Sequence, residues 1–326
     1  MTTPRVVIGL SAVVVAVTEE APHVLVTRGA DDALTGLPFG AFDPGGDRTL
    51  ELTLRQWVSQ QTGFDIGYVE QLYTFGDRGR EAPLPEVGGE AGDRVLSIGY
   101  LALTPERAAV HEARWRDWYR YFPWEDWRGG RPALIDQEII PRLQPWIERA
   151  PRQSDTRRDR VRLAFALDGA AWNEERALDR YELLYEAGLA PEAARDRARL
   201  EGRATPEITP HAMAPGLGEP MLSDHRRILA TAVGRLRAKI KYRPVIFELI
   251  GDTFTLLQLQ RVVEAIAGLE LHKQNFRRLL ERGGLVEGTG QVDARTGGRP
   301  AELFRFRRDS LREGPVGGVN VPTPRG

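Results

Sequence analysis

The chain has 326 residues, of which 41% are hydrophobic and 28% are charged, and its formal net charge at neutral pH is −1. This length allows two domains, each with its own core, and the composition is ordinary for a soluble globular chain. Because the chain has no cysteine, disulfide bonds and thiolate metal sites are excluded, and a reducing compartment is favoured.

The first apolar run, VVIGLSAVVVAV, starts at Val6 and is about twelve residues long. A membrane-spanning helix needs about 20 apolar residues. A signal peptide would combine a basic region with a cleavage site, and neither accompanies this run. The run therefore predicts a buried strand, and we expect a cytoplasmic protein without a membrane partner.

Residues 1–149 alternate predicted strands with turns. The strands are expected in VVIGLSAVVVAV, HVLVTRG, QLYTFGD and RVLSIGYLALTP, and a single helix is expected from about Leu50 to Gln61. This order predicts an α+β domain with a mixed sheet. A tryptophan-rich run from Arg114 to Trp127 closes the domain. Such a run could grip single-stranded nucleic acid, but acidic residues dilute its charge, so core packing is the favoured interpretation.

Residues 150–220 have a different composition. Arg149–Arg160, RAPRQSDTRRDR, has no apolar face and predicts an exposed linker. One or two amphipathic helices are expected from Trp172 to about Leu200, with an apolar stripe that packs within the chain or contacts a second subunit. A stretch rich in proline and glycine, Gly202–Pro220, then separates this helical insert from the last domain.

Residues 221–312 follow the order helix, turn, basic helix and hairpin. Apolar residues from Leu256 to Ile266 recur at three- and four-residue intervals, and Gly268 is a typical helix stop. A second helix is expected from about His272 to Arg282. The segments LVEG and ARTGGRPAELFRF then supply two short strands around a basic turn. This order predicts a winged helix-turn-helix, and residues 313–326 are expected to form a flexible tail.

The charge of this domain points to double-stranded DNA. Residues 221–312 contain 18 Lys and Arg against 10 Asp and Glu, whereas the whole chain contains 45 against 46. A basic part in a nearly neutral chain is expected where one domain binds a polyanion. The second helix would enter the major groove and the wing would contact phosphate. The predicted DNA-binding residues are Lys273, Gln274, Asn275, Arg277, Arg278, Arg295 and Arg299.

Short motifs in the first domain resemble the Nudix fold. LPFG at Leu37–Gly40 and QQTGF at Gln60–Phe64 match its LPGG and EETG elements. With QLYTFGD, YFPWEDW and the basic C-terminal domain, they resemble the Nudix-related transcriptional regulators of NAD metabolism, the NrtR group, over perhaps 220 residues. Residues 150–220 have no counterpart in typical members, and this longer layout is similar to the alphaproteobacterial NadQ type. The resemblance implies a Nudix-like mixed-sheet α/β/α sandwich, a helical insert and a winged helix-turn-helix.

The Nudix motif departs from the family pattern where metal is bound. Nudix pyrophosphatases use glutamates on one helical face to hold Mg²⁺, which prefers anionic oxygen ligands. The two glutamates before TG are Gln60 and Gln61 here, and the positions that open the motif's helix are Gln56 and Trp57. The resemblance therefore implies no catalytic residues, no metal and no required cofactor.

The resemblance also implies a homodimeric repressor of genes for NAD synthesis or salvage. It would bind palindromic DNA and an adenine-nucleotide effector, which could be NAD, ADP-ribose or ATP. Without a metal, the diphosphate needs cationic or backbone donors, and aromatic rings can stack on the base. The candidate effector-binding residues are Arg28, Phe39, Gly40, Tyr73, Phe75, Arg78 and Arg80.

Two other functions stay open at this point. The first is an active Nudix hydrolase of ADP-ribose, or of a related nucleotide diphosphate, with a DNA-binding appendage. The second is a binding module of RNA processing or chromatin. The absent glutamates argue against the hydrolase, and a preference for single strands over a palindromic duplex would favour the RNA module.

Overall fold

The structure is a computed structural model of the chain. It describes residues 5–18, 20–28, 34–63, 65–80, 94–105, 113–208, 216–294, 300–307 and 319. The side chain of Arg28, the whole of Arg295 and Arg299, and all of the predicted tail except residue 319 lie outside this description. Within the described residues, no helix is long and apolar enough to cross a membrane.

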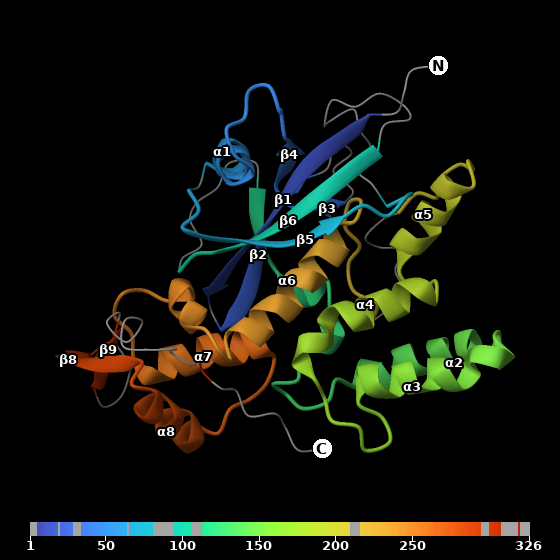
Figure 1. Cartoon of the computed structure of the whole chain (residues 1–326). Helices are drawn as coiled ribbons and strands as arrows, with labels where there is room; N and C mark the ends of the chain where they lie inside the picture. Colours follow the sequence, from blue (N-terminus) through green and yellow to red (C-terminus); the bar gives the residue numbers. More distant parts are fainter. Residues whose placement is uncertain are drawn as a thin grey trace.

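A mixed sheet forms the centre of the molecule (Figure 1). Its main path runs β3-β2-β1-β6-β5, with β4 paired to β1 and β7 paired to β2. Strands β1 and β6 are parallel, whereas the other pairs are antiparallel, so the predicted mixed sheet is confirmed. The strands are β1 (Val6–Thr18), β2 (Ala21–Arg28), β3 (Thr35–Gly36), β4 (Phe39–Ala41), β5 (Tyr68–Phe75), β6 (Arg94–Leu103) and β7 (Ala113–Asp117).

Helices cover both faces of this sheet. On one face, Leu10 of β1 packs in a cluster with Leu54 and Val58 of α1 (Leu50–Thr62). On the other face, Val13 belongs to a larger cluster that includes Ile228 of α6 (His225–Lys239). Successive residues of a strand point to opposite faces, and a strand covered on both faces is apolar throughout. The predicted α/β/α sandwich is therefore confirmed.

Helix α2 (Ile140–Glu148) precedes the predicted helical insert, and the insert contains α3 (Ser154–Phe165), α4 (Ala177–Glu186) and α5 (Pro191–Leu200). A π-helical turn, Ile135–Ile139, precedes α2. Two helices follow Trp172, as the sequence indicated, and Tyr181 and Leu184 of their apolar stripe are buried within the chain. Shorter 3-10 turns lie at Trp118–Arg120, Pro123–Glu125, Pro151–Gln153, Glu174–Arg176 and Pro244–Leu249.

The prediction that Arg149–Arg160 is exposed is confirmed, because none of these residues is buried. The prediction that the segment is a linker is wrong, because most of it belongs to α3. The last turns of α3 bury Val161 and Phe165 beyond the predicted linker. Closer to its start, the guanidinium of Arg157 lies 4.2 Å from the ring centre of Trp146 in α2. The packing therefore comes from a narrow apolar edge and an arginine side chain lying over an aromatic ring, which a hydrophobic pattern does not show.

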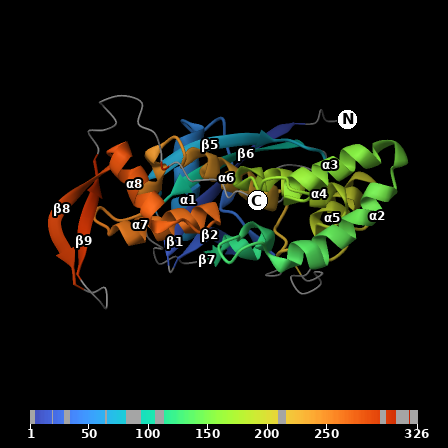
Figure 2. The ribbon, with the colours of Figure 1, turned by 90° about the horizontal axis from the view of Figure 1, so that it is seen from below.

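The C-terminal domain has the predicted winged helix order. Helices α7 (Leu256–Ala267) and α8 (Lys273–Gly283) are followed by the hairpin of β8 (Val286–Asp293) and β9 (Ala301–Phe306). The hairpin lies at one end of the molecule and α2–α5 lie at the other, with the sheet and α6 between them (Figure 2). One cluster of buried apolar side chains extends from the sheet through the insert and α6 into α7 and α8.

The tryptophan-rich run is core, as the sequence favoured. Trp118, Tyr121, Phe122 and Trp124 are each at most 1% exposed. These four side chains belong to the large cluster shared by the sheet, the insert and α7. They are therefore not accessible to stack on single-stranded nucleic acid.

Candidate functional site

Helix α7 begins and ends at residues whose local chemistry explains its bounds. Thr255 forms a capping box with Gln258, in which each side chain pairs with the backbone of the other residue. Gly268 ends the helix with φ 68°, a left-handed conformation that glycine adopts readily. The turn after α7 is therefore set locally by the sequence.

A buried carboxylate fixes the turn between α7 and α8. Oε1 of Glu264 accepts a hydrogen bond from Nε2 of Gln260 and another from the backbone N of Leu271, both 2.9 Å long. Nε2 of Gln260 also donates to the carbonyl of Leu271. Because these groups are buried, the bonds hold the start of α8 against α7 and set the angle between the two helices.

Helix α8 presents one apolar and one polar face. Phe276 and Leu280 are buried against the rest of the domain. On the outer face, Nη2 of Arg278 lies 3.1 Å from Oδ1 of Asn275. A helix with arginine, lysine and amide groups on its exposed face can read base edges in a major groove. The predicted DNA-binding residues of this helix are all exposed: Lys273, Gln274, Asn275, Arg277 and Arg278.

The wing is anchored by aromatic packing. The rings of Phe247 and Phe306 are stacked with centroids 4.3 Å apart, and Phe254 pairs with Phe304 through two backbone hydrogen bonds. On its surface, Arg305 pairs with Glu287. The tip with the two predicted phosphate contacts, Arg295 and Arg299, lies outside the described residues.

In the sandwich domain, the residues matched to the metal-binding positions of the Nudix motif make structural contacts. Gln61 accepts from the backbone N of Phe39 at 3.2 Å and donates Nε2 to its carbonyl at 2.5 Å. Nε1 of Trp57 donates to the carbonyl of Ala41 at 3.0 Å. These bonds hold β4 against α1. Within the described residues, no group of three or more His, Cys, Asp or Glu could hold a metal ion.

Gly40 is needed for the same packing. A Cβ added at this position would lie 2.3 Å from Cδ2 of Trp57. Only glycine therefore allows the indole to lie flat against β4. This contact explains a glycine that the sequence assigned to the effector.

The other effector candidates differ in how accessible they are. Tyr73 is 61% exposed and Arg78 is exposed, whereas Phe75 is buried. Arg80 is also buried, where its two terminal nitrogens donate to the carboxylate of Glu182 at 3.0 and 3.1 Å. Tyr73 and Arg78 can thus meet a ligand directly, while Phe75 and Arg80 are already engaged within the chain.

Three of the predicted effector-binding residues, Phe39, Phe75 and Arg80, lie around His225. Its ring is edge-on to that of Phe39, with centroids 5.1 Å apart, and it lines a small pocket together with Phe75 and Arg80. The free volume of that pocket is about 10 Å³, which corresponds to a single water molecule. A nucleotide must therefore bind elsewhere or displace these side chains.

Burial dominates the electrostatics at the start of α6. It lowers the pKa of His225 to about 3, with a smaller contribution from Arg195. The neutral imidazole accepts the backbone N–H of Leu37 through Nδ1 at 3.0 Å. Burial also raises the pKa of Asp224 to about 7, against the opposing effect of Arg227. Neither residue was among those predicted from the sequence. Three titratable side chains follow one another at the start of this helix, and that run could have pointed to them.

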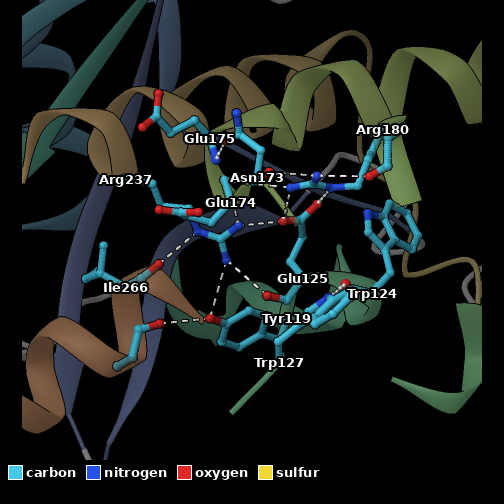
Figure 3. A network of polar contacts seen from close by, with 12 residues as sticks. Tyr119, Trp124, Glu125, Trp127, Asn173, Glu174, Glu175, Arg180, Arg237 and Ile266 are labelled. Carbon is cyan, nitrogen blue, oxygen red and sulfur yellow. Dashed lines mark hydrogen bonds and ion pairs between the residues drawn. The ribbon is translucent and has the colours of Figure 1, made fainter. Parts of the chain in front are cut away.

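A second group that the sequence reasoning missed is a buried cluster of charges around Glu125 (Figure 3). Arg180 of α4 binds this carboxylate through two hydrogen bonds of 2.5 and 2.8 Å, and Arg237 of α6 binds it as well. All three side chains are at most 1% exposed. Burial raises the pKa of Glu125, but the two guanidinium groups outweigh burial and hold the pKa below its ordinary value.

The same cluster reaches the last turn of α7. The hydroxyl of Tyr119 donates to the carbonyl of Ala265 at 2.8 Å, and Nε of Arg237 donates to the carbonyl of Ile266 at 2.9 Å. The backbone N of Trp127 donates to the carbonyl of Gly268 at 2.8 Å. The last carbonyls of a helix have no partner within the helix. Here the segment that follows β7 and helix α6 supply those partners.

Comparison with known families supports the interpretation of the C-terminal domain. Residues 246–306 match the NrtR DNA-binding winged helix domain. The ADPR responsive transcriptional repressor NtrR of Acinetobacter baylyi is 41% identical over 83 residues, which are 26% of this chain. The chain spans about a third, 33%, of the length of that curated relative.

Comparison with solved structures covers nearly the whole chain. NrtR of Shewanella oneidensis in complex with a 27mer DNA superposes with a TM-score of 0.53 at 19% identity, covering 94% of this chain and 95% of that one. A MutT/nudix family protein from Enterococcus faecalis gives 0.50 at 14% identity, covering 94% and 88%. The chain thus contains a winged helix domain of the NrtR type and has the fold of NrtR. The NadQ subtype stays a prediction.

Proposed function

We propose that this protein is a transcriptional repressor that binds operator DNA through α8 and the wing and is controlled by a nucleotide bound to its Nudix-like domain. The exposed polar face of α8, held at a fixed angle to α7 by Glu264, is the observation that carries this proposal. Lysine, arginine and amide side chains on such a face match phosphate oxygens and base edges. The regulated genes would be those of NAD synthesis or salvage.

We also propose that the Nudix-like domain binds without hydrolysis. The side chains at the metal-binding positions are neutral, and Gln61 and Trp57 are used to hold β4 against α1. A glutamine offers only one neutral carbonyl oxygen to a cation, whereas Mg²⁺ catalysis requires anionic oxygen ligands. An active hydrolase is the second candidate, which this arrangement does not favour.

The effector we propose is ADP-ribose. The similar repressor from Acinetobacter baylyi is named for its response to this nucleotide. Without a metal, the diphosphate would pair with arginine or backbone donors. Arg78 is an exposed cation that could supply such donors, and Tyr73 is an exposed ring that can stack on adenine. Arg28, Phe39, Gly40, Phe75 and Arg80 remain secondary candidates, and NAD and ATP are the alternative effectors.

A homodimer on a palindromic operator completes the proposal. Dimeric helix-turn-helix proteins bind two half-sites of a palindrome, which multiplies their specificity. The effector would act by changing the relative positions of the two α8 helices, so that the two states differ in DNA affinity.

A band-shift assay tests this function. The full-length protein should retard a palindromic duplex from upstream of NAD genes, and ADP-ribose should change the retarded fraction. No retardation at low salt would contradict the assignment as a DNA-binding regulator. Release of AMP from ADP-ribose with Mg²⁺, abolished by Glu51→Gln, would instead support the hydrolase.

A further inference from the structure

One arginine occupies the centre of the exposed face of α8. Consecutive residues of an α-helix are about 100° apart around its axis. Arg278 is two residues away from both Phe276 and Leu280, which are the buried side chains of this helix. It therefore lies about 160° from each of them around the axis. Its exposed side chain points directly away from the apolar face.

The other cations in the first two turns of α8 lie on one flank of the helix. Arg277 is about 100° from Phe276 and about 60° from Leu280, and Lys273 is about 60° from Phe276. Both cations are exposed, but they lie beside the apolar face and not opposite to it. A helix about 10–12 Å across fills a major groove about 12 Å wide. Side chains on the flank therefore meet the phosphates along the groove, whereas the central side chain meets the base edges.

The central arginine is held by a neighbouring amide. Nη2 of Arg278 donates a hydrogen bond of 3.1 Å to Oδ1 of Asn275, one turn earlier on the helix. Among the cations of α8, Arg278 alone has such a side-chain partner within the part of the chain that the structure describes. Ordering a long side chain on binding costs conformational entropy. A partner that orients the guanidinium before DNA arrives reduces that cost.

The bond to Asn275 leaves Arg278 able to make a bidentate contact. A guanidinium is a planar fork of N–H donors without an acceptor, and this bond uses one of the two hydrogens on Nη2. The other hydrogen on Nη2 is still paired with a parallel N–H on a neighbouring nitrogen. In the major groove, guanine presents two acceptors, O6 and N7, whereas adenine pairs an acceptor with a donor. Cytosine presents a donor, and thymine one acceptor and a methyl group. A group that only donates therefore fits guanine best.

We propose that Arg278 reads a guanine of the operator and that Asn275 is the positioning residue that orients it. Lys273 and Arg277, on the flank, contact phosphates and do not select a base. The assignment rests on the proposed function, because it requires α8 to enter a major groove. It predicts that two adjacent arginines, Arg277 and Arg278, contribute to binding in different ways.

Selection from a pool of random duplexes tests the role of Arg278. The full-length wild type, Arg278→Ala and Arg277→Ala are each equilibrated with the pool, with and without ADP-ribose, and the retained duplexes are sequenced. We expect the wild-type sites to share a guanine whose enrichment disappears with Arg278→Ala. Arg277→Ala should select the same sequence as the wild type. Retention of every enriched guanine by Arg278→Ala, or an equal loss with Arg277→Ala, would overturn the assignment.

A change of one ring atom in the DNA isolates the bidentate contact. 7-Deazaguanine still pairs with cytosine, but a C–H group replaces its N7 acceptor. At the selected guanine, this base should lower the affinity of the wild type by about fivefold or more. It should not lower that of Arg278→Ala, which has already lost the contact. Arg277→Ala is the matched control, because it should bind both duplexes more weakly and keep the wild-type ratio between them. Equal losses in the wild type and Arg278→Ala would place the contact on another residue.

The same ratio of affinities, guanine over 7-deazaguanine, tests the role of Asn275. Asn275→Ala should bring the ratio towards unity, because the guanidinium of Arg278 is no longer oriented. Asn275→Asp keeps an oxygen acceptor for Arg278 and should preserve the ratio, although its negative charge lowers the affinity for both duplexes. An unchanged ratio in Asn275→Ala, or a lost preference at a different base, would refute the positioning role.

The outcomes distinguish this assignment from the proposed function. If the wild type retains no duplex at low salt, the protein does not bind DNA and both fail. If the wild type selects a sequence without a guanine that depends on Arg278, DNA binding stands and only the assignment fails. Thermal unfolding of each variant should match the wild type, because the substituted side chains are exposed. A change in binding then reports a change in the contacts with DNA.

Discussion

Nε of Arg237 in α6 donates a hydrogen bond of 2.9 Å to the carbonyl oxygen of Ile266 in the last turn of α7. The same guanidinium binds Glu125, which lies in the segment that follows the last strand of the sheet. The helix that supports α8 is therefore joined to the sandwich domain through buried atoms. A movement of the segment that contains Glu125 is therefore transmitted to α7 through these buried contacts and not through an exposed linker.

Glu125→Gln should strongly destabilise the protein. The substitution keeps the size of the side chain but leaves Arg180 and Arg237 buried without their shared carboxylate. Removing one partner of a buried ion pair typically costs about 3–5 kcal/mol, which urea unfolding would measure. Glu287→Gln, in the exposed pair with Arg305, should cost less than about 1 kcal/mol. Equal losses in the two variants would contradict a structural role for the buried charge.

Tyr119→Phe tests the neighbouring link to α7. It removes a single hydroxyl, which donates to the carbonyl of Ala265, and leaves the ring in place. The free energy of unfolding should fall by about 1–3 kcal/mol, because a buried carbonyl loses its partner. Tyr242→Phe, at a half-exposed tyrosine, should have little effect. A Tyr119→Phe variant as stable as Tyr242→Phe would show that the carbonyl of Ala265 finds another donor.

Acid should unfold the protein partly through His225. Its pKa is about 3 in the folded chain against an ordinary value of 6.5, so between these values the unfolded state binds more protons. The stability that this residue contributes is fully present above pH 6.5 and is lost as the pH falls towards 3. His225→Gln keeps an acceptor for the backbone N–H of Leu37 and has no titrating group.

Urea unfolding at several pH values separates the two proteins. Between pH 6 and pH 4, wild-type stability should fall more steeply than that of His225→Gln, by up to about 1.4 kcal/mol per pH unit. The raised pKa of Asp224 gives a slope of opposite sign, with stability lost as the pH rises towards 7, but it acts in both proteins. Parallel pH profiles would mean that His225 is protonated in the folded chain.

Gln61→Glu should disrupt the attachment of β4 to α1. A carboxylate cannot donate to the carbonyl of Phe39 and would face it with like charge, so a loss of about 1–3 kcal/mol is expected. Gln60→Glu is the matched control, because the adjacent Gln60 is exposed and makes no such bond with any residue that the structure describes. Thermal unfolding of both variants measures the difference. Similar melting temperatures of the two variants would indicate that position 61 tolerates a carboxylate, which could bind a metal ion.

Arg277→Ala should weaken operator binding by about tenfold or more, if Arg277 contacts a base edge or phosphate in the major groove. Arg295→Ala, at the predicted wing tip, should chiefly reduce the salt dependence of binding, because a lost phosphate contact lowers that slope by about one. Band shifts at several salt concentrations distinguish the two effects. Arg158→Ala on α3 should bind as the wild type does, and a loss as large as that of Arg277→Ala would point to a general charge effect.

The elements with local signals could be predicted from the sequence. Helix α7 has three such signals, each of which involves only residues close in the sequence. They are the spacing of its apolar residues, the glycine at 268 and the capping box at Thr255. The exposed face of α8 follows from the same periodicity, because burying Phe276 and Leu280 turns the cations outwards. Helix α3 was missed because its stability comes from contacts with α2 and α4, which its own pattern does not encode.

By itself, the sequence determined the mixed sheet and the winged helix, since each depends on residue type or on short-range spacing. The loss of the acidic residues in the Nudix motif stays a prediction. Only the tertiary structure decided which polar groups meet. Glu125, Arg180 and Arg237 are far apart in the chain, and each looks like an ordinary surface residue until folding removes all three from water. Burial raises the free-energy cost of leaving a charge unpaired. The three side chains therefore stay paired, and their contacts join the insert, the sheet and α7 into one unit.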